Sequence, residues 1–242
     1  MNRETANVLL LLVGGTLIKI AADGSYVRYV KPGLLQYLVA SGLVIVVLAV
    51  AAIAADVRRG QAADDGHADG HRHSTRPYWM LLVPAAVILF VAPPALGVSS
   101  VGSSTAPQTM TAPEKSAFPP LPDGAAPELS LLDVIGRAAR DSTGSLDGRE
   151  ITTTGFVVVT ADNGEFDLAR VLITCCAADA RTIRVHLDGN VGGNLDGIPE
   201  GTWLSVTGVV VPGSADAGTN YTPTLTVTNV VRIPAPANTY AY

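Results

Sequence analysis

The sequence has 242 residues, enough for one or two compact units, and its charge is divided unevenly along the chain. Residues 1–100 carry eight Lys or Arg and six Asp or Glu, a balance of +2, whereas residues 101–242 carry eight and fifteen, a balance of −7. Because so acidic a C-terminal half repels phosphate backbones, we expect no nucleic-acid binding. The positive mean hydropathy of +0.34 therefore comes from the first half, and the second half is expected to be soluble.

Three apolar segments near the N-terminus approach the length of about 20 residues that a membrane-spanning helix needs. They lie at about 7–22, 34–55 and 78–98. The second contains no charged residue, and the third opens with a Tyr-Trp pair, which favours the membrane interface. The sequence therefore predicts a three-span transmembrane domain over residues 1–98.

Basic residues in the short loops predict how these spans are oriented. The loop between the second and third spans, residues 57–77, carries four arginines, and the N-terminal tail adds Arg3. The first loop carries Arg28 and Lys31, with Lys19 at its border. This bias predicts a multi-pass protein of the cell membrane with a cytoplasmic N-terminus and an extracytoplasmic C-terminal half.

The loop at 57–77 also holds three of the four histidines, interleaved with aspartates. His67, His71 and His73 at this spacing can bind Zn²⁺ or a similar ion loosely. A solvated low-complexity loop without any metal is the alternative interpretation.

The C-terminal half is expected to contain a linker, one helix and a β domain. Residues 99–127 are rich in Ser, Thr, Ala and Pro, which indicates a flexible tether. Ser130 and Asp133 have the spacing of a capping box, so a short helix is expected from there to about Arg140. The residues from 128 to 242 are therefore expected to form an extracytoplasmic domain that begins with this helix.

Five β-type runs separated by turn residues follow the helix. They cover about 151–160, 166–175, 182–187, 203–211 and 224–233. Five short antiparallel strands favour a small OB-like five-stranded barrel over a β-sandwich, which usually has about seven. In the last run, alternation places Leu225, Val227 and Val231 on the buried face.

The only two cysteines, Cys175 and Cys176, are adjacent at the end of the second β-type run. Together with Asp179 and His186 they form a candidate ligand set for Zn²⁺ or Cu⁺. Successive side chains of a strand point to opposite faces, so both thiols reach one ion only if the chain bends, and the Ala-Ala-Asp that follows would supply a helical turn. A vicinal disulfide is one alternative. Plain packing of the thiols, with Asp179 capping the turn, is the other.

Signals of catalysis are scarce. The sequence has no nucleophile elbow, phosphate loop or dinucleotide fingerprint. His186 is the only histidine in the C-terminal half that would activate a cysteine nucleophile. We therefore expect a non-catalytic protein, with a membrane-anchored thiol enzyme or redox sensor, or a cell-envelope assembly factor, as alternatives.

Several short motifs occur together along the whole chain, besides the three spans and the His/Asp-rich loop. They are PPALG at 93–97, GFV at 155–157, ITCCAADA at 173–180 and PANTYAY at 236–242. In these motifs the sequence resembles the bacterial YcgQ-like family, with the double cysteine as the specific part and an ending that departs mildly from the family's pattern. YcgQ-like proteins are subunits of a two-component permease. The resemblance therefore implies a separate multi-span permease as partner and an accessory role for the β domain in binding or gating at it.

Overall fold

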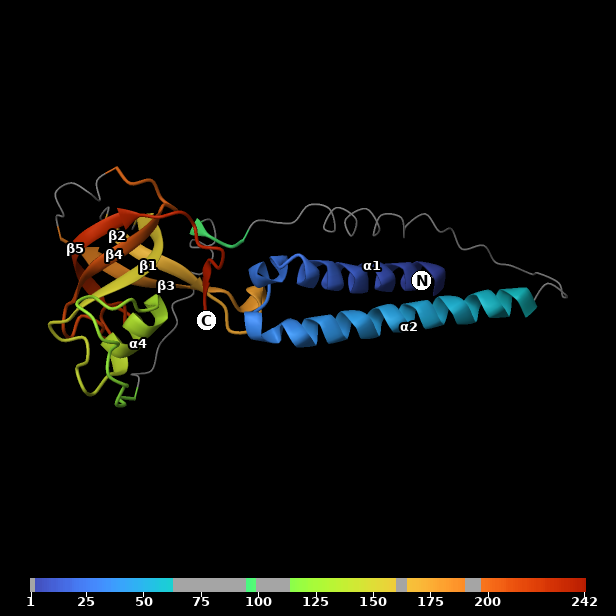
Figure 1. Cartoon of the computed structure of the whole chain (residues 1–242), viewed down its shortest axis with the longest axis horizontal. Coiled ribbons are helices and arrows are strands. Elements are labelled where there is room, and N and C mark those ends of the chain that lie inside the picture. The colour runs from blue at the N-terminus through green and yellow to red at the C-terminus, as the bar shows by residue number, and fades with distance from the viewer. Residues whose placement is uncertain (1–2, 63–94, 99–113, 160–164, 190–196) are drawn as a thin grey trace. The chain divides into compact units, whose positions relative to one another are not determined.

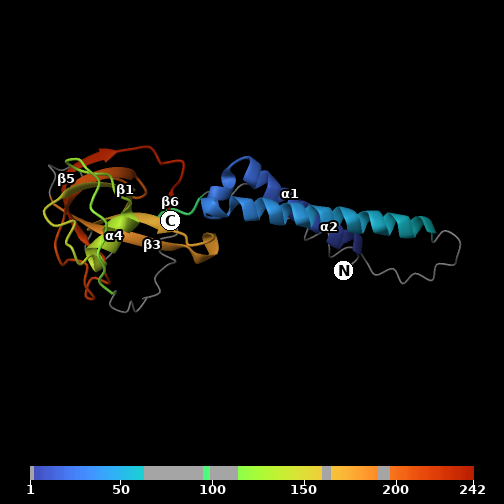
Figure 2. The ribbon, with the colours of Figure 1, turned by 60° about the horizontal axis from the view of Figure 1, so that its bottom comes forward.

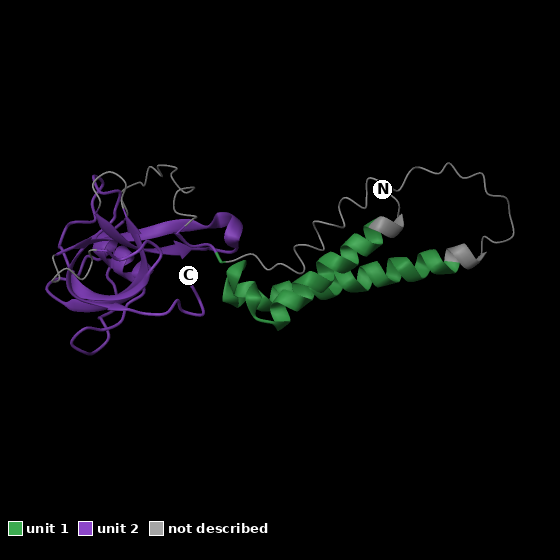
Figure 3. Ribbon diagram, turned by 90° about the horizontal axis from the view of Figure 1, so that it is seen from above, with its two compact units in different colours: residues 1–95 green, residues 96–242 purple. Residues whose placement is uncertain are grey.

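The computed structural model describes residues 3–62, 95–98, 114–159, 165–189 and 197–242. The chain divides into two compact units, residues 1–95 and 96–242, which Figure 3 distinguishes by colour. The first unit is helical, and the second contains every strand of the described residues.

The first unit is a helical hairpin. Helix α1 covers Arg3–Ala22 and helix α2 covers Leu35–Ala62, with 3₁₀ turns at Ser25–Arg28 and Pro32–Leu34 between them (Figure 1). By length and composition, the helical stretch Pro32–Arg58 qualifies as a membrane span or a signal sequence. The apolar part of α1, Ala6–Ala22, is shorter.

The structure supports two of the three predicted spans as helices. Of the third, expected at 78–98, residues 78–94 lie outside the described part, as does most of the loop at 57–77. Residues 95–98 are described, are not α-helical, and from Leu96 onward belong to the second unit.

The two helices of the hairpin approach each other at a pair of glycines. A Cβ atom on Gly14 would lie 2.7 Å from Val46 Cγ2, and one on Gly42 would lie 3.1 Å from Ile18 Cγ1. A Cβ on the neighbouring Gly15 would meet nothing within 4 Å. Gly14 and Gly42 therefore allow the close contact between the two helices of the hairpin, whereas Gly15 faces open space.

The second unit begins its regular structure with helix α4, Leu131–Arg140. Ser130 precedes the helix and its Oγ accepts the Asp133 N–H at 3.1 Å, as the spacing of these two residues predicts. Arg137 is buried: its Nε donates to Asp133 Oδ2 at 3.0 Å and its Nη1 to the Pro119 carbonyl at 2.8 Å. These bonds tie the chain before the helix to the helix itself.

Six strands follow and form one mixed sheet. They are β1 Glu150–Val159, β2 Phe166–Leu172, β3 Arg181–Asp188, β4 Trp203–Val210, β5 Thr224–Arg232 and β6 Tyr240–Ala241. Their order is β1-β4-β5-β3-β2-β6, and β1 also pairs with β2, so the first five strands close into a ring (Figure 1). The β3–β5 and β2–β6 pairs are parallel and the others antiparallel.

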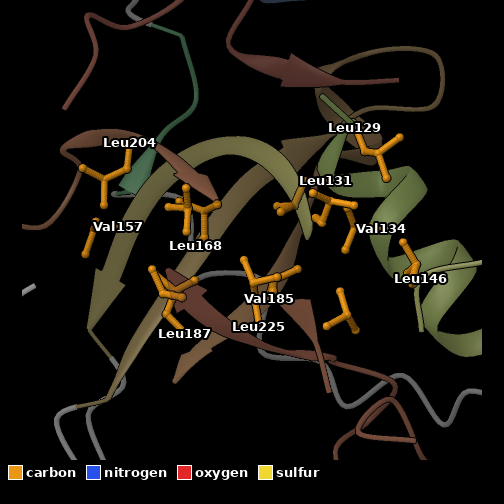
Figure 4. Packing of buried hydrophobic residues seen from close by; sticks show 14 of the residues in the cluster. Leu129, Leu131, Val134, Leu146, Val157, Leu168, Val185, Leu187, Leu204 and Leu225 are labelled. Atoms are coloured by element: carbon orange, nitrogen blue, oxygen red, sulfur yellow. The ribbon is translucent and has the colours of Figure 1, made fainter. Parts of the chain in front are cut away.

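The hydrophobic core of this unit lies inside the ring and under α4 (Figure 4). Leu131 and Val134 on the helix pack into the same cluster as Leu168, Leu204 and Leu225 on the strands, and none of the five is exposed. The helix stripe and the inward faces of the strands therefore share one core, as their apolar periodicity predicts.

The predicted burial of Val231 is wrong. The β4–β5 register pairs Thr207 with Asn229 but Gly208 with Val227, which leaves Thr228 as an extra residue in β5. Such a bulge shifts the alternation by one residue. Val230 therefore packs on the core and Val231 is exposed.

Two segments far apart in sequence meet beside β2. The Leu96 N–H donates to the Tyr240 hydroxyl at 2.8 Å, and Tyr240 is buried. Val98 Cγ1 lies 3.4 Å from the position that a Cβ on Gly201 would take. Figure 2 shows the short green stretch at 96–98 next to the C-terminal strand β6.

Part of the segment expected to be a tether also packs on this unit. Ser116 exchanges backbone hydrogen bonds with Arg140 and Ser142, and the Pro127 carbonyl accepts the Thr152 N–H at 3.0 Å. Residues 99–113 lie outside the described part, and the described residues on both sides of them belong to the second unit. Within the described residues, the β unit thus begins at Leu96, well before α4.

Candidate functional site

The two cysteines lie in a tight turn that connects β2 to β3. The strand ends at Leu172, and a 3₁₀ turn at Ala177–Asp179 follows. The Asp179 carboxylate folds back over this turn: Oδ1 accepts the Thr174 N–H at 2.7 Å, and Oδ2 accepts the N–H groups of Cys175 at 2.8 Å and Cys176 at 3.4 Å. We call residues 174–179 the cysteine turn.

This bend brings both thiols to one side of the chain. Cys175 and Cys176 are free, and their Sγ atoms lie 3.7 Å apart. The two sulfur atoms and a carboxylate oxygen of Asp179 lie within 4.8 Å of one another. Cys175 is exposed, while Cys176 is half-buried. The structure therefore contains the bend that the sequence analysis required for a shared site.

Hydrogen bonding sets the charge of the cysteine turn. The Cys175 S–H lies between the Asp179 carboxylate and the Cys176 sulfur, and these contacts raise the pKa of Cys175 to about 11. The same thiol, together with the three backbone N–H donors, lowers the pKa of Asp179 to about 2. At neutral pH the turn thus holds a charged carboxylate beside a protonated Cys175 thiol.

The C-terminal strand braces the start of the cysteine turn. β6 runs parallel to the end of β2, and the Ile173 N–H donates to the Ala241 carbonyl at 3.3 Å. Ile173 itself is fully buried. Nearby, Arg170 donates from Nη2 to the Asn238 carbonyl at 2.9 Å and stacks over the Trp203 ring. Residues 238–241 therefore fix the strand from which the cysteine turn projects.

His186, the fourth residue of the predicted ligand set, lies on β3 among acidic side chains. Its Nδ1 is 3.0 Å from Asp167 Oδ1, and its Nε2 is 3.4 Å from Glu165 Oε2. The structure groups Cys175, Cys176 and Asp179 but places His186 in this separate cluster.

Asp167 is a polar residue that the sequence analysis missed. It is buried in β2 and faces both His186 and, at 3.8 Å, the Nη1 of Arg184. Asp167 and His186 are direct cross-strand partners, so pairing the second and third β-type runs as a hairpin would have found them.

The predicted loop ligands His67, His71 and His73 lie outside the described residues. Within the described part of the chain, the group of at least three His, Cys, Asp or Glu residues with the spacing of a metal site is Cys175, Cys176 and Asp179.

Comparison with known families identifies the part of the chain that holds this turn. Residues 136–242 match the family model described as the DUF1980 C-terminal domain. No curated protein and no solved structure matches the sequence.

The region that matches this model runs from the middle of α4 to the last residue and contains all six strands. It therefore includes the cysteine turn, the His186 cluster and the C-terminal brace. The helical hairpin lies outside the matched residues.

Proposed function

We propose that this protein is a membrane-anchored, non-catalytic accessory subunit of a two-component permease, and that its DUF1980 C-terminal domain binds or gates at the permease outside the membrane. The observation that carries the proposal is the cysteine turn: three potential ligand atoms lie together on an accessible turn of a unit that is separate from the apolar hairpin. The resemblance to YcgQ-like permease subunits gives the partner.

The finer architecture belongs to the same proposal. It comprises three spans, a cytoplasmic N-terminus and an OB-like barrel made by the ring. The strand ring supports an OB-like barrel, because five strands close on themselves in the order β1-β2-β3-β5-β4. The exposed apolar side chains of α1 and α2 support insertion of the hairpin in a bilayer.

The charge state of the thiols favours ligand presentation over catalysis. A nucleophilic cysteine is activated by a lowered pKa or by an adjacent base. Here the pKa of Cys175 is raised, and the carboxylates of Asp167 and Glu165 face the two ring nitrogens of His186. The rival function of a thiol enzyme is therefore not supported at Cys175, whose thiol is protonated at neutral pH and has no histidine beside it.

Gly15 is a small residue that the hairpin leaves open to a partner helix. The space at the Cβ positions of Gly14 and Gly42 is occupied by the facing helix of the hairpin, whereas Gly15 has no neighbour within 4 Å of its Cβ position. Small residues allow helices to approach closely in membranes. We place the permease contact on the face of α1 that carries Gly15.

Co-purification tests this function. The full-length tagged chain is isolated from its native membrane in mild detergent, and multi-span proteins in the eluate are quantified. We expect a stoichiometric permease, reduced several-fold in Gly15→Leu and unchanged in Gly33→Leu, which also has open space but lies in the connecting turn. An eluate without a multi-span protein, or with equal loss in both variants, would contradict the proposal.

A further inference from the structure

We propose that the cysteine turn is a Zn²⁺ site with three ligands from this chain and a fourth position left for a ligand from another molecule. The ligands are Cys175 Sγ, Cys176 Sγ and one oxygen of Asp179. This inference rests on the proposed function and deepens it, because it names the kind of ion that the β unit presents to its partner.

The distance between the sulfur atoms agrees with a tetrahedral metal site. Two sulfurs bound to one tetrahedral Zn²⁺ at about 2.3 Å each lie about 3.8 Å apart. A linear arrangement with similar bond lengths would hold them about 4.6 Å apart. The observed 3.7 Å between Cys175 Sγ and Cys176 Sγ matches the tetrahedral edge. The turn therefore fits Zn²⁺ better than a two-coordinate ion such as Cu⁺.

Asp179 has room for one metal bond. A carboxylate offers about four lone-pair positions, and backbone N–H groups of Thr174, Cys175 and Cys176 occupy three of them. The remaining position faces the Cys175 thiol, whose proton a metal ion would replace. Asp179 thus holds the turn in shape and supplies a third ligand from the same side chain.

The fourth ligand does not come from the nearby strand. His186 is engaged at both ring nitrogens by Asp167 and Glu165, away from the turn. Structural zinc sites are closed by four protein ligands, whereas sites that act on a bound molecule keep an open position. With Cys175 exposed, the open position is reachable by a partner. The site is therefore suited to passing an ion on rather than to stabilising the fold.

The backbone is already fixed in the geometry that the metal needs. The three N–H bonds to Asp179 hold the turn from inside, and the bond from Ile173 to Ala241 holds the strand that leads into it. Preformed ligands cost little to order when the ion arrives.

Metal binding by the full-length, reduced protein in detergent tests the proposal. A His67→Ala/His71→Ala/His73→Ala background removes any contribution of the histidine loop. Zn²⁺ affinity is measured by competition with a chromophoric chelator, and Co²⁺ is used as a spectroscopic probe of thiolate ligation. We expect one Zn²⁺ per chain, a thiolate-to-Co²⁺ charge-transfer band, and protection of both thiols from alkylation by added Zn²⁺.

Substitutions then assign the ligands. Cys175→Ser and Cys176→Ser should each lower Zn²⁺ affinity more than about 100-fold and weaken the Co²⁺ band, and Asp179→Asn should lower affinity by at least about 10-fold. His186→Ala and Asp188→Asn, the latter a matched loss of an exposed carboxylate, should change affinity less than about two-fold. Equal Zn²⁺ affinity in the cysteine variants, a His186 effect as large as theirs, or selective binding of Cu⁺ would overturn the proposal.

Alkylation protection in the wild-type protein needs no variant, so a folding defect in a cysteine variant does not obscure the result. Failure here is also distinguishable from failure of the proposed function. If the permease co-purifies but Zn²⁺ neither binds nor protects the thiols, the accessory role stands and the zinc site falls. If Zn²⁺ binds but no permease co-purifies, the zinc site stands and the accessory role falls.

Discussion

Asp179 does more in this structure than its position in the sequence indicates. Its carboxylate accepts three consecutive backbone N–H groups, and so turns the end of a strand into a bend with both sulfurs on one side. The need for a bend followed from the alternation of a strand, and the Ala-Ala-Asp sequence indicated where a helical turn would form. That one carboxylate accepts three backbone N–H bonds is a tertiary detail that residue spacing alone does not reveal.

The raised pKa of Cys175 leads to a pH-dependent reactivity. In a metal-free Cys176→Ser protein, we expect the alkylation rate of Cys175 to rise with pH well beyond the range of an ordinary thiol, because only the thiolate reacts. Asp179→Asn removes the negative charge that favours the protonated thiol, so its pKa falls. Alkylation between about pH 7 and 9 then becomes faster. The alkylation rate with iodoacetamide, measured by stopped flow as a function of pH, tests the expected behaviour of both the Cys176→Ser protein and its Asp179→Asn variant.

The titration seen in this experiment belongs to the thiol and not to the carboxylate. Asp179 has a lowered pKa of about 2 and is charged throughout the range tested, so the profile reports the titration of the thiol. Asp188→Asn serves as the control and should leave the profile unchanged. An Asp179→Asn profile identical to that of the parent would show that the carboxylate does not act on Cys175.

At the scale of elements, the helices and the first five strands follow closely from periodicity and capping. The apolar stripe of α4 and the alternation of β1 to β4 are local signals, which is why their bounds are predicted to within a few residues. β6 was missed because two residues carry no period, and its place is decided by pairing with β2. Val231 was misplaced because a bulge at Thr228 depends on how β5 registers against β4.

The N-cap of α4 gives a test of the short helix. Ser130→Ala removes the acceptor for the Asp133 N–H, and we expect a loss of about 1 kcal/mol in the free energy of unfolding of the β unit. Ser130→Asp keeps an acceptor and should retain the stability. Chemical denaturation followed by tryptophan fluorescence reports the change, since Trp203 is buried in β4. Equal stability of Ser130→Ala and the wild type would rule out the cap.

The two adjacent glycines of α1 provide a matched pair for the hairpin. Gly14→Ile places side-chain atoms against Val46 and the backbone of Gly42, and we expect destabilisation of about 1–3 kcal/mol from overpacking. Gly15→Ile has the same change of helix propensity but meets open space. We therefore expect only Gly14→Ile to lower the midpoint of thermal unfolding, measured on the full-length protein in detergent. A similar loss of stability in both variants would mean that helix propensity, and not the contact between the two helices, determines the effect.

At the scale of the whole molecule, the division into two units agrees with the contrast in charge and hydropathy between the halves of the sequence. The cysteines make the orientation testable without added labels, because Cys175 and Cys176 are the only ones in the chain. We expect a membrane-impermeant maleimide to modify the protein on intact cells. Permeabilisation should not increase the labelling, and excess Zn²⁺ should reduce it. Labelling that appears only after permeabilisation would place the β unit in the cytoplasm.

The attachment of the segment expected to be a tether differs from what composition indicates. A Ser/Thr/Ala/Pro-rich stretch of about 28 residues has a root-mean-square reach of roughly 30 Å if it is free at both ends. In the structure, its second part binds α4 and β1, and the residues just before it already contact Tyr240 and Gly201. Composition indicates how stiff a segment is, but not to which of the two units its ends attach.

The hydrogen bond from the Leu96 amide to the Tyr240 hydroxyl has a mechanical consequence. Leu96 is the first residue of the β unit, so a pull transmitted along the backbone from residue 95 arrives at this bond. Tyr240 lies in β6, and β6 is hydrogen-bonded to the strand that leads into the cysteine turn. A pull on the backbone at residue 95 is thereby passed through β6 to Ile173, the residue that precedes the cysteine turn.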